Sequence, residues 1–203
     1  MYRLILYLTY PWKTLFSFHP TLMTIGYIAL VFQASLVYNH DSSIFSYLSR
    51  KTKFTLHWML NVIGGIFMGF GFLVIYQNKN RNDKPHFSSC HAKFGIFALG
   101  YFLTQIIFGI ILRYNSSMKW FKSHLNLKVY HVTSGVCLNL LFTTVFILGF
   151  ASTWFQNQLA ETFNLQDWKL YGIIYFLSIG MISLTYILTK QVNSNYKSIF
   201  TKK

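Results

Sequence analysis

Residues 57–76 read HWMLNVIGGIFMGFGFLVIY and contain no aspartate, glutamate, lysine or arginine. A helix of about 20 residues is roughly 30 Å long, which matches the hydrocarbon thickness of a bilayer. A continuous apolar run of this length predicts a membrane-spanning α-helix, because the strands of a membrane barrel are shorter and alternate polar with apolar residues. The stretch begins at a histidine, and imidazole is costly to place in lipid.

Similar apolar segments precede and follow this stretch. The expected spans run near residues 20–38, 57–76, 91–112, 131–154 and 168–189, and none contains Asp or Glu. Proton pumps and ion-coupled transporters usually bury carboxylates at mid-membrane, so this absence argues against transport. The apolar residues 1–10 form a stub that is too short to span. We therefore expect an all-α, multi-pass membrane protein with five clear spans and a single domain over residues 1–203.

Composition agrees with this fold class and excludes others. The 203 residues are 53% hydrophobic and only 11% charged, which is typical of membrane proteins. The formal charge of +14 lies almost entirely in connectors, and no solvated basic domain is long enough to bind nucleic acid. Cys90 and Cys137 are expected to lie roughly 20 Å apart, which is too far for a disulfide. The chain has no C-x-x-C-H motif, so any haem would be bound non-covalently.

Four histidines begin four consecutive apolar segments: His19, His57, His91 and His131. Because successive spans alternate in direction, His19 and His91 should lie at one membrane face (side A), and His57 and His131 at the other (side B). Histidine is a usual axial ligand of haem iron, and the core of a helical bundle is a usual place for a cofactor. The pattern therefore favours two bis-histidine haem b sites, one near each face. His86, in a side A connector, is a candidate substrate contact.

The same residues also allow interpretations other than haem binding. A histidine at a membrane edge can simply cap a helix or lie in the headgroup layer. Zinc would need four ligands at one point, and only side A offers them, from His19, His91, Cys90 and His86. Gly95 and Gly135, each one turn after a histidine, favour either room for a flat cofactor or close helix packing.

Charge asymmetry predicts the orientation. Eleven of the 18 Lys and Arg residues fall in side B connectors, so side B, with the C-terminus, is expected to be cytosolic. Glycosylation of the Asn115-Ser116-Ser117 sequon on side B would reverse this assignment. Four side B cations lie near His57 and His131 in the sequence and are candidates for attracting an anionic substrate: Arg50, Lys51, Lys53 and Lys128.

At these residues the chain resembles the cytochrome b561 family. Residues 17–23 (SFHPTLM) are similar to the family's F-x-W-H-P-x-x-M opening, and three further stretches look like its other ligand motifs: 56–58 (LHW), 91–95 (HAKFG) and 130–135 (YHVTSG). Three more look most like the subgroup named cytochrome b561 domain-containing protein 2: 46–51 (SYLSRK), 127–131 (LKVYH) and 191–196 (QVNSNY). The resemblance covers roughly residues 14–200.

The resemblance implies a six-helix protein with a four-helix haem core, here about residues 19–154. It implies electron transfer from cytosolic ascorbate through two non-covalent b haems to monodehydroascorbate radical or ferric iron on the lumenal or extracellular side. His57 and His131 would hold the cytosolic haem, and His19 and His91 the other. The endoplasmic reticulum or another endomembrane or vesicle is the expected location, and a homodimer stays open.

The chain departs from the family pattern in two places. The first family helix is reduced here to the stub 1–10, and a lysine that many members carry three residues before the second ligand is Phe54, with Lys53 one position earlier. Two other functions stay open from the sequence: a di-haem subunit that exchanges electrons with quinol, and a non-redox membrane scaffold or transporter.

Overall fold

The computed structural model describes residues 15–38, 45–118, 124–163, 171–175, 177–183 and 186. The stub 1–10, parts of the fifth expected span and the C-terminal end lie outside these residues. The chain divides into two compact units, Met1–Ser88 and Ser89–Lys203. We call the described helices of the first unit the first hairpin, and α5 with α6 of the second unit the second hairpin.

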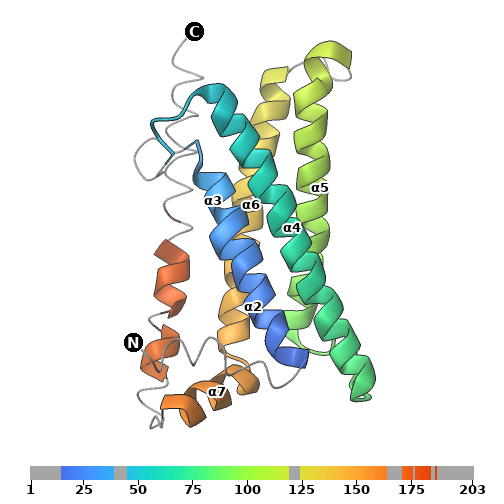
Figure 1. Ribbon diagram of the computed structural model, residues 1–203, viewed down its shortest axis with the longest axis vertical. Helices are drawn as coiled ribbons and strands as arrows, with labels where there is room; N and C mark the ends of the chain where they lie inside the picture. The colour runs from blue at the N-terminus through green and yellow to red at the C-terminus, as the bar shows by residue number, and fades with distance from the viewer. Residues whose placement is uncertain are drawn as a thin grey trace. The chain divides into compact units, whose positions relative to one another are not determined.

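The first hairpin consists of two antiparallel helices (Figure 1). Its first helix runs Leu15–Leu36 and combines the 3₁₀ turn η2 (Leu15–Ser17), α2 (Phe18–Thr24), the π-helical η3 (Ile25–Val31) and α3 (Phe32–Leu36). Its second helix is α4 (Arg50–Arg81). The Ser49 hydroxyl accepts from the Thr52 N–H at 3.2 Å and so caps the start of α4.

Two glycines set the closest approach within the first hairpin. A Cβ on Gly26 would lie 2.8 Å from the Gly64 carbonyl oxygen, and a Cβ on Gly64 would lie 2.7 Å from the Gly26 carbonyl oxygen. Tyr27, Phe32 and Met68 are almost fully buried beside this crossing. Small residues let membrane helices come this close, since apolar burial drives little association in lipid.

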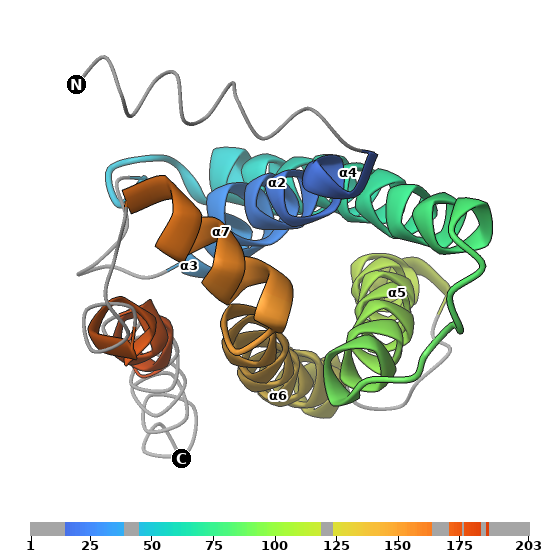
Figure 2. The same cartoon turned by 90° about the horizontal axis from the view of Figure 1, so that it is seen from below.

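The second hairpin consists of α5 (Cys90–Met118) and α6 (His124–Phe150), which lie side by side in Figure 2. Ser89 caps α5 by accepting from the Ala92 N–H at 3.2 Å. Phe102 and Phe142 are buried between the two helices with their rings edge to face, 6.2 Å apart. After a turn at Ala151 and Ser152, α7 (Thr153–Phe163) follows, again with a serine cap.

Four of the expected spans are confirmed as helices long and apolar enough to cross a membrane: Leu15–Leu36, Arg50–Arg81, Cys90–Tyr114 and Asn126–Phe150. Large apolar side chains on α4 point outward, and Ile66, Phe70 and Leu73 each expose more than half of their surface. Such faces suit a lipid solvent. In the fifth expected span the described residues include an apolar helix over Tyr171–Ser183.

Candidate functional site

Both histidines of the first hairpin reach across to the opposite helix. The His19 Nδ1 atom of α2 is 3.0 Å from the Gly71 carbonyl oxygen of α4. The His57 Nδ1 atom of α4 is 2.8 Å from the Ala34 carbonyl oxygen of α3. The helices are antiparallel, so the two histidines lie at opposite ends of the hairpin. Each ring is half-buried.

The second hairpin has one hydrogen bond of this kind, at His91. The His91 Nδ1 atom of α5 is 3.0 Å from the Val145 carbonyl oxygen of α6, and the ring lies against Gly149, where a Cβ would be 3.3 Å from Cε1. At the other end the His131 ring of α6 lies against Gly109 of α5, where a Cβ would be 3.4 Å from Cε1. A side chain at Gly149 would press on the His91 imidazole, whereas the distance at Gly109 is that of an ordinary contact.

These contacts define the tautomer of the rings. A backbone carbonyl oxygen only accepts hydrogen bonds, so Nδ1 carries the hydrogen in His19, His57 and His91. In the neutral ring the lone pair then lies on Nε2, the nitrogen that would bind iron. A second hydrogen bond of this kind fixes the orientation of a ligating histidine and raises its basicity. Three of the four histidines are therefore oriented for axial ligation of haem through Nε2.

The two hairpins share one spacing. Gly71 lies 14 residues after His57 on α4, and Val145 lies 14 residues after His131 on α6. Fourteen residues are nearly four helical turns, or about 21 Å, so the two residues of each pair lie on the same face of their helix. One more residue separates His19 from Ala34, and the π-helical stretch η3 takes up that residue with its wider turns.

The expectation that each histidine begins its helix is wrong for the two side B residues. His19 and His91 are each the second residue of an α-helix, α2 and α5. His57 and His131, in contrast, lie two turns inside α4 and α6, which begin at Arg50 and His124. Polar and charged residues continue a helix beyond the hydrocarbon when its end is capped, as Ser49 caps α4.

The candidate substrate cations of the first hairpin occupy these extra turns. Arg50 and Lys51 are exposed, whereas the Lys53 ammonium donates to the Ser46 carbonyl oxygen at 3.0 Å. Tyr38, which the sequence did not single out, lies with its ring 5.6 Å from the His57 ring. Partial burial raises the pKa of the Tyr38 hydroxyl, although the Arg50 guanidinium acts in the opposite direction. The hydroxyl is therefore a hydrogen-bond donor at neutral pH.

In the second hairpin the remaining candidate cation, Lys128, is exposed on the first turns of α6. The candidate acceptor-side residue, His86, belongs to the first unit. Its ring stacks on Tyr76 with centroids 4.3 Å apart, and its Nε2 donates to the Asn80 Oδ1 atom at 2.7 Å. Lys79 ties the same connector down by donating to the Pro85 carbonyl oxygen at 2.7 Å. His86 is thus held in one orientation at the end of α4.

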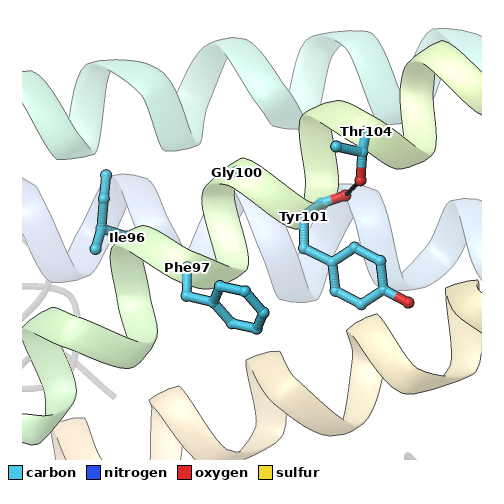
Figure 3. A pocket seen from close by; sticks show the side chains of 5 residues that line it. All are labelled: Ile96, Phe97, Gly100, Tyr101 and Thr104. Carbon is cyan, nitrogen blue, oxygen red and sulfur yellow. Dashed lines mark hydrogen bonds between the residues drawn. The ribbon is translucent and has the colours of Figure 1, made fainter.

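The remaining candidate features are the cysteines, a possible metal site and a surface hollow. Both cysteines are free and exposed, as the absence of a disulfide framework predicts. Within the described ranges, no group of three His, Cys, Asp or Glu side chains could hold a metal ion. A hollow of about 620 Å³ lies along α5, lined by Ile96, Phe97, Gly100, Tyr101 and Thr104 (Figure 3). None of the candidate site residues lines it.

Comparison with known proteins places this geometry in a family. The model of the family "Eukaryotic cytochrome b561" matches residues 18–156, which include all four histidines. The transmembrane reductase CYB561D2 of Bos taurus is 28% identical over 187 residues, covering 92% of this chain and 79% of that protein. The probable transmembrane reductase CYB561D1 of Mus musculus is 28% identical over 93% of the chain and 78% of its own length.

A more distant relative carries a more specific name. The lysosomal membrane ascorbate-dependent ferrireductase CYB561A3 of Mus musculus is 29% identical over 66% of the chain and 54% of its own length. No solved structure matches the chain. The family match spans four apolar helices long enough to cross a membrane and the four histidines they carry. The chain is therefore an integral membrane protein of the eukaryotic cytochrome b561 family.

Proposed function

We propose that this protein is an ascorbate-dependent reductase that transfers electrons across a membrane through two b haems. His57 and His131 hold one haem, and His19 and His91 hold the other. The observation that carries the proposal is the repeated Nδ1–carbonyl hydrogen bond, which leaves the Nε2 lone pair for iron at two levels in the first hairpin and at one in the second. The family match and the reductase names of the relatives support it.

The proposed pairs each take one histidine from each hairpin. In both hairpins the residue that accepts from a histidine lies 14 residues after the other histidine on the same helix. If the hairpins packed together as a four-helix core, one histidine of each would therefore lie at the same height at each end. The two levels are then about 21 Å apart along the helices. Haem b, once bound, carries single electrons because its iron cycles between the ferric and ferrous states. The chain supplies the ligands, holds their orientation and excludes water between the levels.

Side B is the proposed donor side. It carries the larger share of Lys and Arg, which supports a cytosolic side B. Arg50, Lys51 and Lys128 are exposed near the helical turns above His57 and His131, where they can attract the ascorbate monoanion. Each electron that leaves ascorbate leaves a monodehydroascorbate radical and a proton on that side. Tyr38, protonated beside His57, is a hydrogen-bond donor for the same anion.

Side A is the proposed acceptor side. There one electron reduces ferric iron to ferrous iron, or reduces monodehydroascorbate radical to ascorbate with uptake of a proton. The relative named as a ferrireductase supports ferric iron. His86, held by Tyr76 and Asn80, is the proposed contact for the acceptor. An endomembrane, such as the endoplasmic reticulum or a vesicle, is the proposed location.

The test is a reduced-minus-oxidised spectrum of the purified protein. Adding ascorbate should produce the Soret shift and split α-band of six-coordinate b haem, at about two haems per chain by pyridine haemochrome assay. A colourless preparation would reject the proposal in favour of a scaffold or transporter. Reduction by a quinol but not by ascorbate would favour the di-haem subunit of a quinol-linked complex.

Replacing His86 with alanine should separate the two half-reactions. We expect reoxidation of the ascorbate-reduced protein by a ferric chelate to slow by about tenfold, because a positioned contact to the acceptor is lost. Reduction by ascorbate should keep its wild-type rate. Stopped-flow absorbance in the Soret region measures both rates. Lys84→Ala, which changes an exposed residue of the same connector, is the control and should leave both unchanged. Equal rates in His86→Ala and wild type would remove His86 from the site.

A further inference from the structure

One buried polar side chain of the second hairpin has no role in the function proposed above. Gln105 lies in α5, exposes only 7% of its surface and is surrounded by an apolar span. Its Nε2 donates to the His131 carbonyl oxygen at 3.1 Å and to the Ser134 Oγ atom at 2.7 Å. Ser134 in turn donates to the Tyr130 carbonyl oxygen at 2.7 Å. The amide nitrogen of Gln105 therefore holds the helical turn that carries His131.

The oxygen of the same amide is unsatisfied. Gln105 Oε1 is buried and has no hydrogen-bond partner among the residues that the structure describes. A buried carbonyl without a partner is destabilising, so native proteins rarely keep one without a functional or structural reason. The amide lies against Gly135 of α6, where a Cβ would be 3.4 Å from Gln105 Nε2. Gly135, one turn after His131, thus faces the glutamine.

The position of Gln105 suggests what its oxygen is for. His91 lies against Gly149 and donates to the carbonyl oxygen of Val145, four residues earlier. His131 lies against Gly109, and the residue four positions before Gly109 is Gln105. Gln105 therefore occupies the same position relative to His131 that Val145 occupies relative to His91. Val145 accepts the hydrogen bond with its main-chain oxygen, whereas Gln105 also offers a carbonyl oxygen on its side chain.

We infer that Gln105 is a positioning residue for His131. Its amide N–H groups fix the backbone of the ligand's turn, and its Oε1 accepts the Nδ1–H of the His131 ring when Nε2 binds iron. A side-chain acceptor differs from a main-chain one because a single substitution removes it. The inference rests on the proposed function, since it assigns His131 as a haem ligand.

Gln105→Leu tests it, because leucine has a similar volume and none of the polar atoms. The haem held by His131 should transfer to a haem-scavenging apoprotein about 10- to 100-fold faster, as loss of an outer-shell partner weakens ligation. Its midpoint potential should rise, because a less basic imidazole stabilises ferric iron less. Its low-temperature electron paramagnetic resonance signal should shift as the ring turns. The haem held by His19 and His91 should keep its potential and its signal.

Asn139→Leu is the matched control. Asn139 is also a buried amide of the second hairpin, it lies two turns beyond His131 on α6, and it donates to the Gly135 carbonyl oxygen at 2.8 Å. Equal effects of the two substitutions, or a shift of both haems together, would show a merely structural role and overturn the inference. So would unchanged potentials and signals in Gln105→Leu. If that variant folds poorly, Gln105→Met provides the same comparison. A wild-type protein without haem would instead reject the proposed function itself.

Discussion

Replacing His57 with alanine should remove one haem and leave the other, so that the haem content falls from about two to about one per chain. His91→Ala should remove the other haem. Each substitution deletes an axial ligand and the Nδ1–carbonyl hydrogen bond that orients it, to Ala34 in one case and Val145 in the other. Pyridine haemochrome assays and reduced-minus-oxidised spectra measure the change. His86→Ala, which removes a histidine outside the apolar spans, should keep both haems.

Double substitutions test the pairing. His19→Ala combined with His91→Ala should lose only the haem that either single change loses, because both residues would bind the same iron. His57→Ala combined with His91→Ala should lose both haems. If both combinations lost both haems, the histidines would be paired within the hairpins and not between them. Two haems retained in both single variants would contradict the ligand assignment altogether.

Placing a methyl group on Gly64 should destabilise the first hairpin. The added Cβ would lie 2.7 Å from the Gly26 carbonyl oxygen and 2.7 Å from a Val31 methyl carbon, and a backbone atom of a helix cannot move aside alone. Overpacking of this kind typically costs about 1–3 kcal/mol. We expect Gly64→Ala to lower the midpoint of thermal unfolding in detergent, measured by the loss of the monodisperse peak in size-exclusion chromatography.

Gly64→Ala should also alter the absorption spectrum of the haems. Gly64 lies midway on α4 between His57 and Gly71, so separating the helices lengthens the hydrogen bonds at both levels. The α-bands of both haems should broaden. Gly69→Ala is the control, because a Cβ there meets no atom within 4 Å. If Gly64→Ala were as stable as Gly69→Ala, the crossing would not hold the hairpin together.

Sequence-based interpretation predicted the membrane spans well, and its candidate haem ligands stay a prediction. Runs without charge determine where helices cross a membrane, and the described residues confirm four of them. It misplaced the starts of two helices, at His57 and His131, because helix ends depend on caps and not on hydrophobicity. It also passed over Gln105 and Tyr38. A single amide inside the span 91–112 was a visible signal, yet nothing local indicates that it contacts the turn of His131.

The amino-acid sequence by itself determined the class of this protein and its four apolar helices, and it predicts an alternation of helix direction with two histidines at each membrane face. These follow from local chemistry, since lipid excludes charge and requires every backbone group to be paired within the helix. Only the tertiary structure decided which carbonyl oxygen meets the imidazoles of His19, His57 and His91. That choice depends on the register of opposing helices, which the Gly26–Gly64 crossing and the π-helical stretch set in the first hairpin. The tautomer of the rings, and with it the nitrogen left for iron, is therefore a property of packing.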